Sequence, residues 1–255
     1  MRIARFLVDG RPVAGRLEGD HLLPFRDDSL EDLRETAPPV PIGRAAFLTP
    51  CRPGKIVAVG LNYRDHARER GKPLPSEPLL FLKPPSAALA HGESIILPAG
   101  AGRVDHEAEL AIVIGRKASH VGEAEASGAI LGYTCFNDVT AREIQDREIQ
   151  FTRAKGFDTF APFGPWIETG LDPGDLAVTG SVNGTIRQSS RTREMIFSPA
   201  FLVAFVSRVM ALFPGDLIAT GTPAGIGPLG PGDRVEITIE GIGTLGNSVA
   251  GPRSS

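Results

Sequence analysis

The stretch from Gly102 to Gly115 reads GRVDHEAELAIVIG, and it constrains the fold of this chain more than any other. Its second half, Leu110 to Ile114, is apolar and partly β-branched, which predicts a buried strand. Its first half carries Asp105, Glu107 and Glu109, which the alternation of a strand places on one face, about 6.5–7 Å apart in succession. Like charges repel in a partly buried site, so a divalent cation with oxygen ligands is the simplest explanation. The alternative is that Glu107 and Glu109 lie on the solvated face of an edge strand, which is the more common setting for such a pair of residues on its own.

The composition suits one large domain, or one domain with a small appendage. The chain has 255 residues, of which 42% are hydrophobic, and a net charge of −3. That charge favours neither a nucleic acid nor an anionic membrane as partner. Cys51 and Cys135 have no metal-ligand spacing and form no disulfide framework, which predicts a reducing, cytoplasmic location. Neither a signal peptide nor a transmembrane segment is expected, because no apolar run is long enough.

Residues 1 to 50 predict a small β-rich N-terminal domain. Asp9-Gly10 and Gly19-Asp20 are turn signals between strand-like runs. Ser29 is expected to cap a short helix that continues to Glu35. A proline-rich segment, residues 37–43, then predicts a stiff linker, so that a catalytic domain would occupy residues 51–255. The strand-like runs are residues 2–8, 13–17 and 21–25.

Strands also dominate the remainder, and they do not alternate strictly with helices. This pattern predicts a mainly β, α+β fold and argues against a Rossmann sheet or a (β/α)₈ barrel. Helices are expected over residues 139–149 and, with Ser198 as N-cap, over residues 199–213. Residues 155–165 are rich in glycine, proline and aromatic residues, which predicts an ordered loop. Further strands are expected at residues 55–60, 79–82, 130–136, 178–182, 216–220, 234–240 and 242–249.

Several polar residues are candidates for chemistry. His66 and Glu69 are three apart on a predicted helix, so the carboxylate could orient the imidazole as a general base. An inconsequential surface pair is the alternative. Asp138 follows a strand and is either a helix cap or a metal ligand. Lys155 could stabilise an anion or simply be solvated. The Gly-rich turn at Thr222 could present amides and a hydroxyl to a carboxylate, or be an ordinary turn.

Six motifs in order resemble the fumarylacetoacetate hydrolase superfamily, over roughly residues 50 to 250. The nearest resemblance is to short members such as acylpyruvases and 2-hydroxyhepta-2,4-diene-1,7-dioate isomerases. The resemblance implies a mixed β-sandwich roll and a homodimer. The motifs are Asn62-Tyr-Arg-Asp-His-Ala67, Phe81-Leu-Lys-Pro84, His106-Glu-Ala-Glu-Leu110, Asn137-Asp-Val-Thr-Ala-Arg142, Lys155-Gly-Phe-Asp-Thr-Phe160 and Gly221-Thr-Pro-Ala-Gly225.

The resemblance also implies roles for individual residues. The metal, Mg²⁺ or Mn²⁺, would be held by Glu107, Glu109 and Asp138. The catalytic group would comprise His66 and Glu69, which activate water, and Lys155, which helps to hold the substrate and to stabilise charge. Substrate-binding residues would be Lys83, Arg142, Gln145 and Thr222.

The expected function is metal-dependent chemistry on small 2-oxo or enol carboxylates. We expect hydrolysis of a C–C bond in an acylpyruvate-type (2,4-dioxo acid) substrate, because both members of the His66–Glu69 pair are present. The alternative enzyme is an isomerase or decarboxylase of 2-hydroxyhepta-2,4-diene-1,7-dioate or oxaloacetate-type acids in the catabolism of aromatic compounds. An inactive carboxylate-binding homologue is the alternative outside the class of enzymes.

Overall fold

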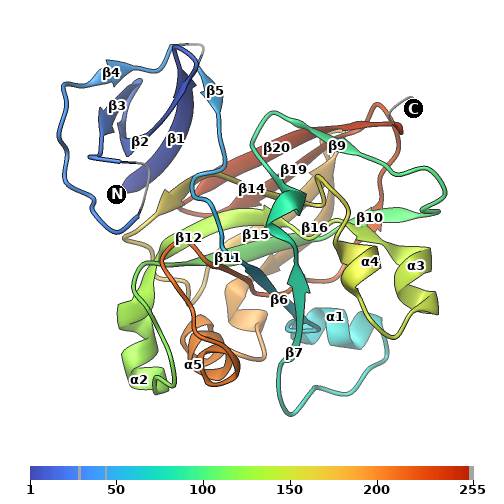
Figure 1. The fold of residues 1–255 in the computed structure, drawn as a ribbon. Coiled ribbons are helices and arrows are strands. Elements are labelled where there is room, and N and C mark those ends of the chain that lie inside the picture. Colours follow the sequence, from blue (N-terminus) through green and yellow to red (C-terminus); the bar gives the residue numbers. More distant parts are fainter. Residues whose placement is uncertain (28–29, 44, 253–255) are drawn as a thin grey trace.

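The computed structural model describes residues 1–27, 30–43 and 45–252, and it is built mainly of strands (Figure 1). The largest sheet has the order β4-β3-β2-β1-β14-β12-β11-β17-β6-β7, with β5 beside β1 and β8 beside β14. Its strands are β1 (Arg2–Val8), β2 (Arg11–Glu18), β3 (His21–Pro24), β4 (Val40–Pro41), β5 (Ala46–Phe47), β6 (Ile56–Gly60), β7 (Leu79–Lys83), β8 (Ala88–Leu89), β11 (Ala108–Ile114), β12 (Ile130–Asn137), β14 (Ala161–Glu168) and β17 (Leu217–Ala219).

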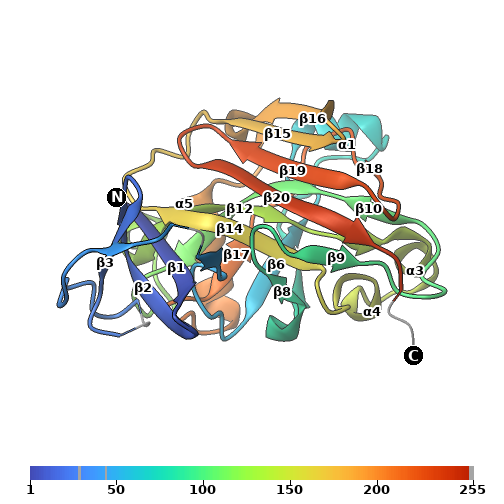
Figure 2. The ribbon, with the colours of Figure 1, turned by 90° about the horizontal axis from the view of Figure 1, so that it is seen from above.

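A second sheet packs across the middle of the first and has the order β16-β15-β19-β20-β9. Figure 2 shows β19 and β20 lying over β12 and β14. The strands of the second sheet are β9 (Ser94–Ile96), β15 (Ala177–Val182), β16 (Thr185–Arg191), β19 (Arg234–Ile239) and β20 (Gly243–Ala250). A small third sheet joins β10 (Val104–His106), β13 (Thr140–Ala141) and β18 (Gly227–Pro228).

Strand β11 lies in the interior, between β12 and β17. Its residues alternate between two cores: Leu110, Ile112 and Ile114 belong to one, and Ala111 and Val113 to the other. A strand buried on both faces has a continuous apolar sequence, as this one has. The prediction of a buried strand is confirmed, and the alternative of a solvated edge strand is wrong.

The helices are short and lie around the sheets. They are α1 (Arg64–Glu69), α2 (Glu123–Ala126), α3 (Arg142–Arg147), α4 (Thr152–Lys155) and α5 (Pro199–Val209), with 3₁₀ turns at Pro85–Ala87, Ser127–Ala129 and Thr192–Glu194. The Ser198 hydroxyl accepts a hydrogen bond from the Phe201 N–H at 3.2 Å, which confirms the predicted cap of α5. The helix ends at Val209 and not at Phe213, because Leu212 exchanges backbone hydrogen bonds with Ala118.

The N-terminal strands β1, β2 and β3 form where the sequence predicts them, and β1 pairs with β14 of the main sheet. The predicted helix is wrong over residues 30–35, whereas Ser29 lies outside the described residues. Glu35 forms a bridge with Phe25 instead, which keeps this segment extended. An independent domain over residues 1–50 stays a prediction.

Two predictions near the acidic strand need correction. The helix expected over residues 139–149 covers only α3, because Thr140–Ala141 pair with β10. The loop expected over residues 155–165 is also shorter: Lys155 ends α4, and β14 begins at Ala161. Prolines and a glycine are uncommon inside strands, so the sequence of β14 does not look like a strand. Its pairing with β12 also contains a register shift.

Candidate active site

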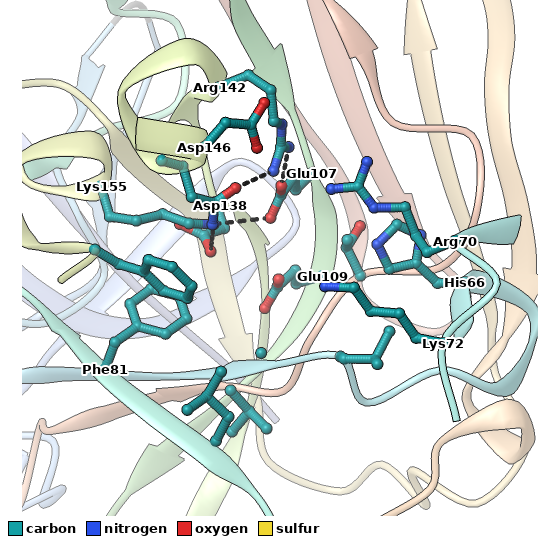
Figure 3. Close-up of a pocket in the computed structure, with 17 residues that line it drawn as sticks. His66, Arg70, Lys72, Phe81, Glu107, Glu109, Asp138, Arg142, Asp146 and Lys155 are labelled. Carbon is teal, nitrogen blue, oxygen red and sulfur yellow. Dashed lines mark hydrogen bonds and ion pairs between the residues drawn. The ribbon is translucent and has the colours of Figure 1, made fainter. Parts of the chain in front are cut away.

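A cavity of about 220 Å³ opens beside the first residues of β11. The predicted metal ligands line it together with His66, Lys155, Arg142, Gln145 and Thr222 (Figure 3). Its apolar wall comes from Val59, Leu79, Phe81 and Phe151. The structure thus brings together most of the residues that the motifs single out.

Sheet geometry brings three carboxylates together at one end of β11. Glu107 lies at the break between β10 and β11, and Glu109 lies in β11 itself. Asp138 follows β12, and its backbone N–H donates to the Glu107 carbonyl at 2.9 Å. One oxygen from each side chain lies within 4.8 Å of the others, and all three residues are buried. Asp105 is not part of this triad, although it precedes Glu107 by two residues.

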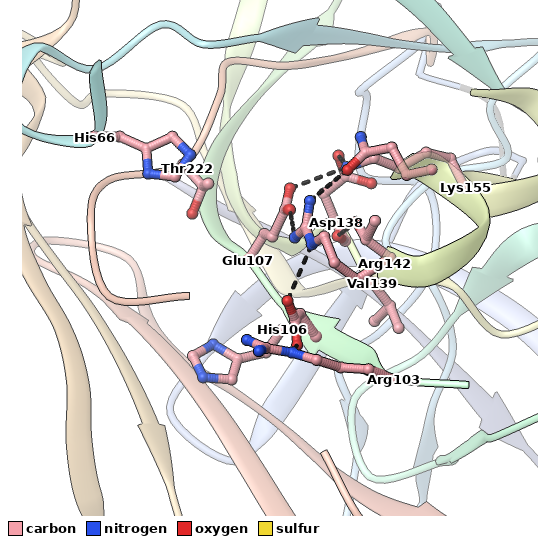
Figure 4. Close-up of polar contacts among 12 residues, drawn as sticks. His66, Arg103, His106, Glu107, Asp138, Val139, Arg142, Lys155 and Thr222 are labelled. Carbon is pink, nitrogen blue, oxygen red and sulfur yellow. Dashed lines mark hydrogen bonds and ion pairs between the residues drawn. The ribbon is translucent and has the colours of Figure 1, made fainter. Parts of the chain in front are cut away.

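Buried cations contact two carboxylates of the triad, and Figure 4 shows Arg142 and Lys155 beside Glu107 and Asp138. The Lys155 ammonium donates to Glu107 Oε2 at 2.9 Å and to Asp138 Oδ2 at 2.5 Å. The Arg142 guanidinium donates to the other oxygen of Glu107 and, at 3.0 Å, to Asp105 Oδ2. Asp105 therefore holds Arg142 in place, which is a role that the sequence did not suggest. The only indication in the sequence was that Asp105 lies two residues before Glu107 and therefore on the same face of the strand.

Lys83 occupies a different place from the substrate contact that the motif implied. It does not line the cavity. Its buried ammonium donates to Asp138 Oδ1 at 2.5 Å and to the Val139 carbonyl at 3.1 Å. Burial lowers the pKa of Lys83, and the charge of Asp138 opposes that effect only in part. This position favours a role in holding Asp138 over direct contact with substrate.

The carboxylates of the triad differ in their electrostatic surroundings. Burial alone would raise the pKa of Glu107, but the charges and hydrogen bonds of Lys155 and Arg142 outweigh it and hold that pKa at about 2. Burial, followed by repulsion from Asp138 and Glu107, holds the pKa of Glu109 well above its usual value. Glu109 accepts a hydrogen bond from the Gly221 N–H at 2.8 Å and forms no ion pair among the described residues.

These residues fit a divalent cation. Hard ions such as Mg²⁺ and Mn²⁺ prefer carboxylate oxygens. Each oxygen of Glu107 and Asp138 accepts one hydrogen bond and keeps a second lone pair. Glu109 forms no ion pair among the described residues and has a raised pKa, so it is the carboxylate whose ionised form such an ion would stabilise.

The predicted dyad is formed on α1. The Nδ1 of His66 lies 2.8 Å from Glu69 Oε2, and Glu69 Oε1 accepts a hydrogen bond from the Gly225 N–H at 3.0 Å. His66 is buried and lines the cavity. With a carboxylate accepting from Nδ1, the lone pair of Nε2 is available to take a proton.

The hydroxyl of Thr222 is already committed to the protein. It donates to the Ala108 carbonyl at 2.9 Å and accepts from Gln188 Nε2 at 2.7 Å. The hydroxyl proton of Thr222 is therefore not free for a substrate anion. Gln145 lines the cavity and accepts a hydrogen bond from Arg142.

Sequence reasoning missed Arg70 and Lys72, which also line the cavity. Arg70 is four residues after His66, so helix periodicity could have placed it on the same face. The position of Lys72 depends on how the chain turns after α1, and the sequence pattern alone does not predict that turn.

Fold and site together define a strand-rich protein with a buried carboxylate triad suited to a divalent cation and, across the same cavity, a histidine–carboxylate dyad. The family model described as "Fumarylacetoacetate (FAA) hydrolase C-terminal" matches residues 55–250, and a model for an N-terminal region, "Rv2993c-like, N-terminal", matches residues 1–50. The chain belongs to the fumarylacetoacetate hydrolase family, as the motifs predicted.

The names of similar proteins describe different reactions. A 2-hydroxyhepta-2,4-diene-1,7-dioate isomerase from Mycobacterium marinum is 42% identical, with a TM-score of 0.92 and full coverage of both chains. A maleylpyruvate hydrolase from Sphingobium sp. SYK-6, in complex with manganese(II) and pyruvate, is 32% identical, with a TM-score of 0.82 over 99% of this chain and 100% of that one. A mitochondrial oxaloacetate tautomerase of Rattus norvegicus is 40% identical over 83% of this chain and 72% of its own. In the described part of this chain, no helix is long and apolar enough to span a membrane.

Proposed function

We propose that this chain is a metal-dependent enzyme that hydrolyses a C–C bond in a small 2,4-dioxo acid of the acylpyruvate type. The observation that carries the proposal is that His66, which Glu69 orients, lines the same cavity as the triad of Glu107, Glu109 and Asp138. The manganese and pyruvate of the Sphingobium hydrolase belong to the same chemical classes as the proposed metal and product.

The residues of the chain supply binding, charge and proton transfer. A divalent ion held by the triad would polarise the 2-oxo group and stabilise negative charge beside it. Lys155 adds a buried positive charge at the same place, where its contacts with Asp138 and Glu107 outweigh the effect of burial and raise its pKa. It therefore stays protonated near neutral pH and acts as an electrostatic group, not as a base.

His66 would act on water. Glu69 fixes the ring so that Nε2 accepts a proton from a water molecule that attacks the carbonyl further along the substrate. The C–C bond then breaks, its electron pair goes to the carbon next to the 2-oxo group, and that carbon takes up a proton. Pyruvate and a carboxylic acid are the products.

Isomerisation is an equally supported second candidate, because the relatives include an isomerase and a tautomerase. It needs the same triad and Lys155, but the dyad would move a proton between carbon and oxygen of the substrate without adding water. Decarboxylation of an oxaloacetate-type acid would use the same triad, with its ion, and the same Lys155. A role in the catabolism of aromatic compounds, a homodimer and a cytoplasmic location are also proposals.

The two reactions are distinguished by their products. Acetylpyruvate supplied with Mn²⁺ should give pyruvate and acetate, and His66→Ala should stop this reaction. His120→Ala is the matched control, because His120 is exposed and does not line the cavity. Interconversion of keto and enol oxaloacetate without acetylpyruvate cleavage would favour the isomerase, and release of CO₂ from oxaloacetate would favour the decarboxylase.

A further inference from the structure

The ring of Phe81 lies beside the buried ammonium of Lys155. Nζ of Lys155 lies over the ring, 5.0 Å from its centroid. The face of an aromatic ring carries partial negative charge, so it attracts a cation within about 6 Å, and more strongly where water is excluded. Both residues line the cavity on the side away from His66 (Figure 3). Phe81 is therefore placed to act on a charged group of the site as well as to form its apolar wall.

Lys155 is the last residue of a helix that is too short to be stable by itself. Helix α4 has four residues, and the Lys155 N–H donates to the carbonyl of Phe151, the residue before the helix, at 3.0 Å. A single turn is unstable in isolation, because its few hydrogen bonds do not offset the conformational entropy that is lost in forming it. The position of Lys155 must therefore depend on what α4 packs against.

The outer strand β7 and the prolines after it supply that packing at both ends of α4. At the start of the helix, the rings of Phe151 and Phe81 meet edge to face, with their centroids 5.6 Å apart. At its end, Gly156 approaches Pro84 so closely that a Cβ on Gly156 would lie 3.3 Å from Pro84 Cδ. The Phe81 ring thus contacts the residue before α4 and, in Lys155, the last residue of α4.

We propose that Phe81 is a positioning residue that acts through Lys155. Its ring holds the ammonium where that group donates to Glu107 and Asp138, and so keeps a positive charge at the triad. A divalent ion would draw on the charge of the same two carboxylates, whereas the attraction of the ring does not depend on them. The inference rests on the proposed function, in which the 2-oxo acid gains negative charge beside this ammonium.

A double-mutant cycle on equilibrium binding tests whether Phe81 acts through Lys155. Oxalate is the probe, because it is a small dianion without an apolar part that could contact the wall of the cavity. Calorimetry with the Mn²⁺-supplied protein should show that Phe81→Leu weakens oxalate binding by about threefold to tenfold, as expected for the loss of a buried cation–π contact. In a Lys155→Met background, the same substitution should change the affinity by less than about twofold.

Two further variants serve as controls. Phe81→Tyr keeps a ring face and should bind oxalate within about twofold of wild type. Phe47→Leu removes a half-buried ring that packs on Phe6, with centroids 4.5 Å apart, outside the cavity, so it should not change the affinity. Urea unfolding of each variant shows whether it is folded, and the comparison of Phe81→Leu with Phe81→Tyr decides the question if Lys155→Met does not fold.

A loss of affinity in Phe81→Leu that is equally large with and without Lys155 would overturn the inference. Equal weakening by Phe81→Leu and Phe81→Tyr, no effect of Phe81→Leu, or no binding of oxalate by wild type would also overturn it. All these readouts are of binding. Failure of acetylpyruvate and oxaloacetate turnover in wild type, which would overturn the proposed function, is therefore distinguishable from failure of the positioning role.

Discussion

Gln188 donates a hydrogen bond from Nε2 to the hydroxyl of Thr222, 2.7 Å away, and is itself completely buried. Its Oε1 accepts from the Ala108 N–H at 2.9 Å, and the Nδ1 of His106 lies 3.1 Å away. One amide thus ties β16 to the turn at Thr222 and to the first residue of β11. This side chain therefore reinforces the direct hydrogen bond from the Thr222 hydroxyl to the Ala108 carbonyl, which holds the turn against the acidic strand.

Gln188→Leu is expected to lower the free energy of unfolding by about 3 kcal/mol, because each buried polar group left without a partner costs about 1–3 kcal/mol. The KM for a 2-oxo acid should rise, since the turn at Thr222 loses its anchor. Urea unfolding and steady-state kinetics measure the two effects. Gln150→Leu, at an exposed position, should change neither. A Gln188→Leu protein with unchanged stability and KM would contradict this role.

Glu109→Gln should separate folding from metal binding. Its carboxylate is buried with a raised pKa and without an ion pair among the described residues, so the neutral amide should not destabilise the metal-free protein. Wild type should gain about 2.7 kcal/mol when free Mn²⁺ is about 100 times its Kd, whereas the variant should gain little. Thermal unfolding with and without Mn²⁺ reports both. Equal stabilisation of the two proteins by Mn²⁺ would exclude Glu109 as a ligand.

His91 should make stability depend on pH. Burial, followed by repulsion from Arg234, lowers its pKa below the ordinary 6.5, and its neutral Nδ1 accepts the Gly246 N–H at 3.0 Å. As pH falls through about 6.5, the unfolded chain takes up a proton that the native ring resists. The contribution of His91 is therefore complete above that pH and is lost as the pH falls toward the lower native pKa.

The test compares urea unfolding at about pH 7.5 and about pH 5.5. His91→Asn should lose less stability on acidification than wild type does. His120→Asn, at an exposed position, should behave like wild type. An unchanged pH dependence in His91→Asn would show that the ring does not contribute.

Gly71→Ala should cost about 1 kcal/mol of stability, because an alanine at a φ of +60° is strained. A Cβ at this position would meet no atom within 4 Å, so the cost is conformational and not steric. Gly128 is equally open but has no positive φ, so Gly128→Ala should be neutral or slightly stabilising. Chemical denaturation compares the two variants, and equal stabilities would contradict the assigned strain.

Local patterns predicted those parts of the fold that local physics determines. The apolar run of β11, the Asp9-Gly10 turn and the Ser198 cap each depend on a few neighbouring residues. The short α3 and the strand in residues 161–165 were not predictable in this way, because their structures depend on pairing with β10 and β12.

In the candidate site, too, some features were predictable and others depend on long-range contacts. The motif resemblance predicted that the acids and the dyad belong to one site. The burial of Lys83 behind Asp138 depends on the pairing of β6 with β7, and the commitment of the Thr222 hydroxyl depends on Gln188 from a distant strand. Arg70 and Lys72 face the cavity only because the chain reverses at Gly71.

The central claim is that a divalent ion at the carboxylate triad is required for chemistry on a 2-oxo acid. The most direct measurement is turnover of acetylpyruvate and oxaloacetate after chelation and again after addition of Mg²⁺ or Mn²⁺, in wild type and in Glu107→Ala. We expect turnover to disappear on chelation and to return with the ion in wild type, and to stay absent in Glu107→Ala. Turnover that survives chelation, or that the ion restores equally in Glu107→Ala, would contradict the account.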